Sequence, residues 1–171
     1  RVSYLRTIFR KSRCLYFYSI NQQAQIIITL FQQVNEIGRC TRLKPITDTL
    51  PKALVPVGGR PLIEHVVRKL KASGIEEAVV NVHHFADKIE EWVARQDIMD
   101  MQVSDERKEL LETGGGILHA RQYLDGCGRF LIHNVDILSD VDFKWFEQSV
   151  PEDAMAALLV SERETSRYLL F

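Results

Sequence analysis

Residues 38–57, GRCTRLKPITDTLPKALVPV, form the loop that separates the first apolar strand of the chain from its first helix. This loop holds Gly38, the pair Thr41 and Arg42, and a later lysine, Lys52. After a strand, such residues place backbone N–H donors and two cations where the strand ends, which suits a polyphosphate. Basic loop residues alone are usually just solvated, so the inference depends on their order.

Apolar runs and helical patterns alternate on both sides of this loop. A strand is predicted at 26–34, and a helix at 61–73 has Pro61 in its first turn and Gly74 as its stop. Further strands are predicted at 78–82, 101–103, 130–135 and 154–160. Further helices are predicted at 86–95, after the glycine run 114–116 through Tyr123, and from an Asp142 cap through Gln148.

This alternation predicts an α/β fold, a Rossmann-like three-layer α/β/α sandwich with a mostly parallel central sheet. Ligands of such sheets bind at the carboxyl ends of the strands. The loop at 35–52 and Asp136, which follows the strand at 130–135, are therefore expected to meet there. His133 falls on the opposite face from Asn134 and Asp136, so it is expected in the core, as are Trp92 and Trp145.

Composition limits the classes of partner. The chain has 171 residues and a net charge of -1, so no broad positive field would attract nucleic acid. Its three cysteines lack metal-type spacing, which favours a reducing cytoplasm. Its longest apolar run, 26–31, is far below the roughly 20 residues that cross a bilayer. We therefore expect no nucleic-acid partner and no membrane span.

Residues 1–25 differ from the rest of the chain in carrying five basic side chains and no acidic one. They are expected to be an extension, poorly ordered or non-native, ahead of a domain at 26–171. A transit peptide is the alternative, because it shares the acid-poor bias.

The order of residues in the loop resembles the signature of the sugar-1-phosphate nucleotidyltransferases, in which A-A-G-x-G-T-R-L-x-P is followed by P-K-x-L-x-P-V. Thr41–Pro45 match the end of the first piece and Pro51–Val57 match the second. Residues 58–63 continue the match at the start of the next helix. The resemblance covers residues 34–171, the first part of a family domain, so the predicted sandwich is incomplete.

The resemblance implies a role for each matched residue near the phosphates. Arg42 would grip the β and γ phosphates and Lys52 would bind phosphate oxygens at the reacting centre, with Gly38 and Thr41 beside them. In FLIHNVD, residues 130–136, Asp136 would coordinate Mg²⁺, and Asn134 lies on the same face.

A second match, ETGGG at 112–116, concerns the base of the nucleotide. Glycines at a helix start let backbone N–H groups approach a ligand closely. The form is similar to that of N-acetylmuramate 1-phosphate uridylyltransferases and mannose-1-phosphate guanylyltransferase-like members. It implies that Glu112, Thr113, Gly114 and Gly115 contact the base and ribose, and a similar family segment near the nucleotide adds Asn81.

The implied reaction joins a sugar 1-phosphate to a nucleoside triphosphate, UTP or GTP, and releases pyrophosphate. The chain departs from the signature at 36–40, EIGRC, where only the first glycine survives. A side chain at Cys40 obstructs close approach to phosphate, and Glu36 adds a negative charge. Three alternatives therefore remain: an inactive fragment, a non-catalytic nucleotide-binding or regulatory relative, and an enzyme that acts on phosphocholine or another small alcohol phosphate. An apolar strand at Tyr168–Phe171 would leave an edge for self-association.

Overall fold

The computed structural model of the chain describes residues 2–5, 16–19, 24–29, 43, 45–109, 111–126 and 128–159. The strands of the main sheet are β1 (Val2–Leu5), β2 (Tyr16–Ser19), β3 (Ala24–Thr29), β6 (Glu77–Val82), β7 (Asp100–Asp105), β8 (Arg129–Asn134) and β9 (Ala156–Leu159). The helices are α1 (Leu62–Ala72), α2 (Ala86–Arg95), α3 (Glu112–His119), α4 (Arg121–Leu124) and α5 (Phe143–Gln148). Two 3-10 turns, η2 (Ile46–Asp48) and η3 (Lys52–Leu54), precede a small hairpin of β4 (Pro56–Val57) and β5 (Arg60–Pro61).

Four neighbouring strands, β8-β3-β6-β7, form the parallel half of the sheet. Their order differs from their order in the chain, so helices must cross from one strand to the next. The predicted strands at 78–82, 101–103 and 130–135 correspond to β6, β7 and β8, with β7 three residues longer than expected. The α/β class is confirmed, and all four carboxyl ends lie at one edge of the sheet.

The other strands, β1, β9 and β2, pair antiparallel, so the sheet is mixed rather than mostly parallel. β1 and β2 come from the stretch that was expected to precede the domain, and they pair with β9 and β8. The first parallel strand starts at Ala24, two residues before its predicted start, and 30–34 lie outside the described residues. The domain boundary at 25 stays a prediction.

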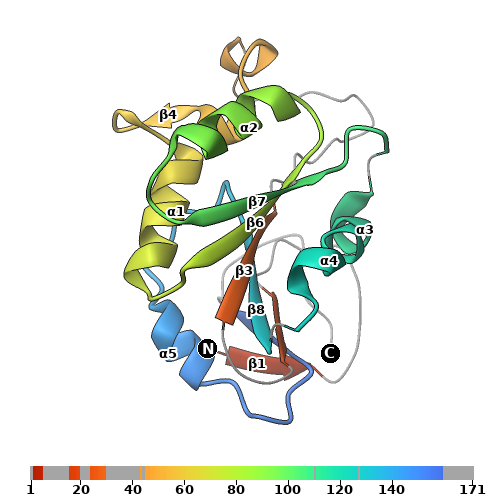
Figure 1. The fold of residues 1–171 in the computed structure, drawn as a ribbon. Coiled ribbons are helices and arrows are strands. Elements are labelled where there is room, and N and C mark those ends of the chain that lie inside the picture. Colours follow the sequence, from red (N-terminus) through yellow and green to blue (C-terminus); the bar gives the residue numbers. More distant parts are fainter. Residues whose placement is uncertain are drawn as a thin grey trace, which may run out of the picture.

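Helices cover both faces of the sheet, as predicted for a three-layer sandwich (Figure 1). Alternate residues of β6 show this directly. Val80 packs with the buried residues of α1, α2 and α5, whereas Val79 packs with Ala120, between α3 and α4, and with Leu124 of α4. Successive side chains of a strand point to opposite faces, so one strand can supply both cores.

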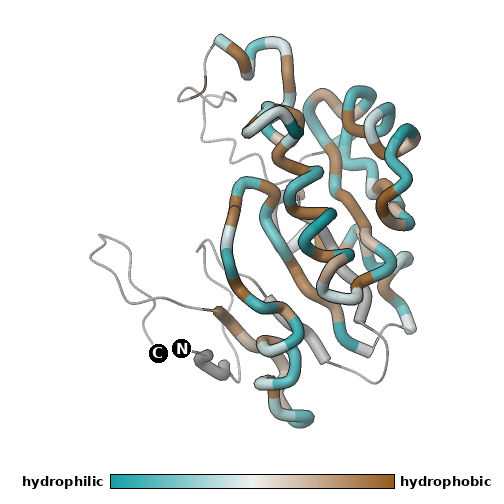
Figure 2. Tube along the Cα trace, turned by 90° about the vertical axis from the view of Figure 1, so that its left-hand side faces the viewer, coloured by the Kyte–Doolittle hydropathy of each residue, from teal (hydrophilic) through white to brown (hydrophobic). Residues whose placement is uncertain are grey.

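The helix α1 shows why its sequence folds this way. It buries Leu62, Ile63, Val66, Val67 and Leu70 on one stripe, in agreement with the predicted helix at 61–73. Hydrophobic and hydrophilic residues alternate along the helical turns in Figure 2. Each fully buried aliphatic side chain contributes about 1.5–3 kcal/mol, which holds the helix on the sheet.

Two expectations about helices were wrong. The glycines 114–116 lie inside α3 rather than ahead of it, and α3 ends at His119, before the separate turn α4. Trp92 packs partly buried against the core, but Trp145 is 48% exposed. Phe143 and Phe146 take the inward positions of the six-residue α5, so its remaining aromatic residue faces outward.

In the part of the chain that the structure describes, no helix has the length and apolar character needed to cross a membrane. The edge strand predicted at 168–171 lies outside the described residues.

The cap of α5 gives a first test. As predicted, Asp142 is the N-cap, and its carboxylate accepts a hydrogen bond from the backbone N–H of Trp145 at 3.0 Å. Replacing Asp142 with alanine should lower the free energy of unfolding by about 1 kcal/mol, because a helix donor loses its acceptor. Urea denaturation checks this, with the exposed Asp140→Ala as control. Equal stability of the two variants would contradict the capping role.

The buried His133 gives a second test. As predicted, it lies in the core, 2% exposed and edge-on to Phe143, and burial lowers its pKa from 6.5 to about 4. The unfolded chain therefore binds a proton that the folded chain excludes. This contribution to stability is complete above about pH 6.5 and is lost, by about 3 kcal/mol, as the pH falls toward 4.

The difference between the wild type and a His133→Leu variant in denaturation curves at pH 7, 6, 5 and 4 isolates this term. The loss of stability on acidification should be smaller in His133→Leu and unchanged in the exposed His84→Gln. If the free energy of unfolding falls by the same amount in the wild type and in His133→Leu as the pH is lowered, the imidazole is not buried in its neutral form.

Candidate functional site

Polar residues form a row across the carboxyl ends of the parallel strands. In the register of the sheet, Thr29 is paired with both Asn134 and Asn81, and Asn81 is paired with Ser104. The four positions therefore stand side by side on one line through β8, β3, β6 and β7. The sequence predicted Asn81 and Asn134 for this edge, and the register of the sheet puts them on the two strands that flank β3.

The loop after β3 and the segment after β8 meet through an ion pair. The ammonium Nζ of Lys52 donates to the carboxylate Oδ2 of Asp136 at 2.5 Å, across 84 residues of chain. The two side chains are 24% and 21% exposed, so solvent reaches both. The meeting of these two segments at the sheet edge was predicted from the sequence. The pair presents one cation and one carboxylate at the same place.

η3 and the hairpin after it position Lys52. The backbone N–H groups of Leu54 and Val55 close the turn on the carbonyls of Pro51 and Lys52, and Ala53 is buried in the core. Pro51 fixes the extended entry to the turn, with φ −63° and ψ 145°. Pro51 of the signature therefore fixes the backbone immediately before the lysine.

Three predicted residues of the loop, Gly38, Thr41 and Arg42, lie outside the described residues, as does Cys40. Their assignment to the phosphates stays a prediction.

The glycines of α3 differ in their surroundings. A Cβ on Gly114 would meet no atom within 4 Å, so this side of the helix is open. A Cβ on Gly115 would lie 2.8 Å from Leu111 Cβ, and one on Gly116 would lie 2.6 Å from Glu106 Oε1 and 2.7 Å from Asn81 Nδ2. Gly116 therefore lets α3 approach the sheet, while Gly114 leaves room on the outside. Glu112 and Thr113 form the first turn of this helix.

Asn81 is 5% exposed and donates its amide Nδ2 to Oε1 of Glu106 at 2.6 Å. Its amide oxygen Oδ1 is buried without a hydrogen-bond partner in the described part of the chain. A direct contact of Asn81 with substrate stays a prediction. Glu106 is 6% exposed, and burial raises its pKa, although hydrogen bonds from Asn81 and from the backbone of Leu111 act in the opposite direction.

Sequence reasoning missed Glu106. It lies in a run of charged residues, SDERKE at 104–109, which looks like a solvated turn. The alternation of β7 continued by one residue is the signal that could have found it, since Ser104 and Glu106 are buried and Asp105 is exposed.

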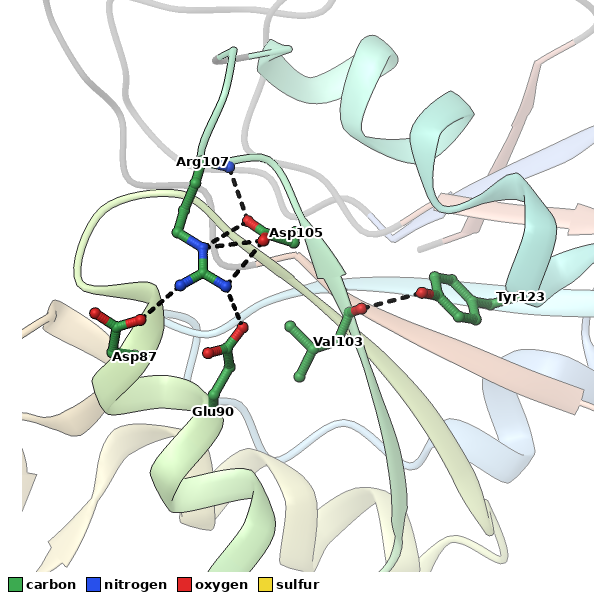
Figure 3. A network of polar contacts seen from close by, with 6 residues as sticks. All are labelled: Asp87, Glu90, Val103, Asp105, Arg107 and Tyr123. Atoms are coloured by element: carbon green, nitrogen blue, oxygen red, sulfur yellow. Dashed lines mark hydrogen bonds and ion pairs between the residues drawn. The ribbon is translucent and has the colours of Figure 1, made fainter.

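Neighbours of Glu106 bind to elements on both sides of the sheet. Arg107 reaches away from it to α2, with its guanidinium 2.5 Å from Asp87 and 2.7 Å from Glu90, while its Nε donates to Asp105 (Figure 3). These groups are largely exposed, so each pair contributes little alone. On the other face of the sheet, Ser104 Oγ lies 2.9 Å from His119 Nδ1 of α3.

Asp136 is the residue from which we judge whether the site fits a metal ion. The described residues contain no group of three or more His, Cys, Asp and Glu side chains that could hold an ion by themselves. Magnesium, however, commonly binds through one or two carboxylates together with substrate phosphates. A single partly exposed carboxylate at a strand end, beside an ammonium group, fits that mode and does not fit an all-protein cage.

A sheet covered on both faces, with a cation, a carboxylate and a glycine-containing helix at its carboxyl edge, is typical of the class of α/β nucleotide-binding proteins. The family model of the nucleotidyl transferases matches residues 37–168. The chain belongs to this family.

Two curated relatives are N-acetylmuramate alpha-1-phosphate uridylyltransferases. The protein of Caulobacter vibrioides is 41% identical over 131 residues, 74% of this chain and 51% of the relative. That of Neisseria meningitidis is 38% identical over 130 residues, 73% of this chain and 56% of the relative. The chain thus spans about half the length of these relatives.

A solved structure, HddC from Yersinia pseudotuberculosis complexed with GMP-PN, is 26% identical. It superposes with a TM-score of 0.61 over 73% of this chain and 53% of that one. The fold and the family expected from the sequence are therefore confirmed.

The contrast between Gly114 and Gly116 predicts opposite effects of the same substitution. Gly114→Ala should raise the free energy of unfolding by about 0.5–1 kcal/mol, because alanine favours the helix and meets open space. Gly116→Ala should lower it by about 1–3 kcal/mol, because the methyl group must displace the bonded Asn81 and Glu106. Thermal unfolding of both variants measures the difference. A change of the same sign in the free energy of unfolding of the two variants would contradict the close approach of α3 to the sheet at Gly116.

Proposed function

We propose that this chain forms the nucleotide-binding part of an enzyme that joins a sugar 1-phosphate to a nucleoside triphosphate, giving a nucleotide sugar and pyrophosphate. One observation supports this most strongly. The two motif residues with expected roles at the phosphates, Lys52 and Asp136, are in direct contact although 84 residues separate them. A cation and a carboxylate at the same strand edge suit a polyphosphate bound together with a metal ion.

In the proposed reaction, an oxygen of the sugar 1-phosphate attacks the α-phosphorus of the nucleoside triphosphate. The bond from this phosphorus to the bridging oxygen breaks, and pyrophosphate leaves with the electron pair. No protein nucleophile is needed, because the attacking oxygen belongs to the substrate. The protein therefore acts by holding two anions in line and offsetting their repulsion.

Lys52 and Asp136 would divide the electrostatic work. When phosphate oxygens arrive, the Lys52 ammonium group can turn from the carboxylate to them and neutralise charge near the reacting centre. Asp136 would then be the residue that holds Mg²⁺, which would supply positive charge to offset that of the phosphates. We assign Arg42, Gly38 and Thr41 to the phosphates on the resemblance of the loop alone.

Residues of α3 and its surroundings would bind the rest of the nucleotide. The open side at Gly114 supports a close approach of a base or ribose to the backbone, with Gly115, Glu112 and Thr113 beside it and Asn81 and Asn134 on the row beneath. UTP and GTP are the favoured nucleotides, since one group of relatives consists of uridylyltransferases and one related structure holds GMP-PN. The cysteine pattern favours the cytoplasm.

The alternative is a nucleotide-binding relative without turnover. The departure of residues 36–40 from the family signature favours it, because Glu36 adds negative charge and Cys40 replaces a glycine beside the phosphates. Binding without pyrophosphate release would distinguish it from the enzyme.

Calorimetric titration of the 171-residue chain with UTP or GTP in Mg²⁺ tests the site. Lys52→Met and Asp136→Asn should each weaken binding at least about tenfold, because each removes a charge that faces the phosphates or their metal. The exposed Lys71→Met and Asp153→Asn make the same charge changes elsewhere and should bind as the wild type does. Equal affinities of all four variants would exclude the proposed site.

Pyrophosphate release tests the reaction itself. The chain is incubated with UTP or GTP and a panel of sugar 1-phosphates that includes N-acetylmuramate 1-phosphate. Release that depends on both substrates and is lost in Asp136→Asn supports the enzyme, whereas nucleotide binding without release supports the non-catalytic relative.

A further inference from the structure

Glu106 is a buried carboxylate that the proposed reaction does not use. Its Oε1 accepts from the Asn81 amide of β6 at 2.6 Å, and its carboxylate also accepts from the backbone N–H of Leu111. Burying a charged group is costly unless it is hydrogen-bonded, and the raised pKa of Glu106 reflects that cost. A group kept in this position despite the cost calls for a structural or functional reason.

The partners of Glu106 join three elements. Asn81 belongs to β6, the backbone N–H of Glu106 bonds to the carbonyl of Val82 at 2.7 Å just after β7, and Leu111 is the N-cap residue of α3. Leu111 offers no side-chain cap, so the carboxylate of Glu106 supplies an acceptor for this end of the helix. A carboxylate is also favoured there by the helix dipole.

The fit at Gly116 makes the arrangement specific. Its ideal Cβ would lie 2.6 Å from Glu106 Oε1, so the carboxylate occupies the space that any other residue at 116 would need. Gly114 stays open on the opposite side. The position of Glu106 therefore sets how deeply α3 sits on the sheet and where the open side of that helix faces.

The flanking residues hold the main chain on either side of Glu106. Asp105 and Arg107 point outward, and Arg107 binds the α2 carboxylates of Asp87 and Glu90 (Figure 3). The backbone that carries Glu106 is thus held against α2 on one face, while the side chain reaches under α3 on the other. The charges of two histidines, His83 after β6 and His119 in α3, also act to lower the pKa of this carboxyl group, against the effect of burial.

We propose that Glu106 is a positioning residue that holds the glycine-containing helix α3 against β6 and β7, and thereby sets the nucleoside side of the binding site. The part of this inference that concerns the nucleoside rests on the function proposed above. Glu106 acts through Asn81 and the N-terminus of α3 and touches no phosphate. Its loss should therefore weaken the binding of a nucleotide and leave the binding of a bare polyphosphate unchanged.

Three substitutions at 106 and one control separate this role from general stability. Glu106→Ala removes both acceptors, and Glu106→Asp shortens the side chain by one methylene group. Glu106→Gln keeps the length, and after a turn of the Asn81 amide it can satisfy Asn81 and Leu111 together. Glu109→Ala removes an exposed carboxylate from the same turn.

Amide hydrogen exchange of the 171-residue chain measures the position of α3 without any ligand. In Glu106→Ala and Glu106→Asp, residues 112–119 should exchange at least about tenfold faster, with α1 and α2 unchanged. Glu106→Gln and Glu109→Ala should exchange as the wild type does. Unchanged exchange of α3 in Glu106→Ala, or an equal rise in all helices, would overturn the proposal.

The ligand measurement uses UTP, GTP and inorganic tripolyphosphate, each with Mg²⁺. Glu106→Ala should weaken nucleotide binding about tenfold and leave tripolyphosphate affinity unchanged. Glu106→Gln should bind nucleotide as the wild type does. Equal weakening of both ligands would overturn the role at the nucleoside. If the wild type binds none of the three, the proposed function fails, whereas the exchange measurement still decides whether Glu106 positions α3.

Discussion

The parallel pairing of β8, β3, β6 and β7 is the constraint on which the rest of the structure depends. Parallel strands place all their carboxyl ends at one edge, and their connections must cross over the faces of the sheet. The helices that make those crossings bury both faces, and the segments that leave the carboxyl ends gather at the edge. The row of polar residues, the loop with Lys52 and the carboxylate of Asp136 meet at this edge because each lies at, or follows, the carboxyl end of a parallel strand.

The contact between Lys52 and Asp136 has the energetic character of a site rather than of a core. Both side chains remain about one-fifth to one-quarter exposed, so the pair adds little to stability. Because both side chains are partly exposed, each can exchange its partner in the pair for a ligand whose charge has the same sign as that partner: an anion for Lys52 and a cation for Asp136. A pair sealed from water could make that exchange only at the cost of an uncompensated buried charge.

The carboxylate of Glu106, in contrast to the partly exposed pair of Lys52 and Asp136, is buried. It is enclosed between the sheet and α3, and two donors, the Asn81 amide and the Leu111 backbone, make its burial tolerable. The glycine at 116 is the geometric counterpart of this arrangement, since only a residue without a side chain leaves room for the carboxylate. The two acidic residues at the sheet edge therefore differ in surroundings: Asp136 is partly exposed, as the proposed ligand site requires, and Glu106 is enclosed beneath the helix that we propose it supports.

The sequence by itself determined the α/β class, the helices at 62–72 and 86–95, the core position of His133 and the meeting of Lys52 with Asp136. These follow from local periodicity and from the rule that loops gather at the carboxyl ends of parallel strands. Tertiary structure alone decided that β1 and β2 pair antiparallel with β9 and β8, because strand pairing joins residues that are distant in the chain. It also decided that the glycines continue α3 and that Trp145 faces outward. The alternation of β7 indicates the face on which Glu106 lies, but its contacts with β6 and α3 join residues distant in the chain and were decided by the tertiary structure.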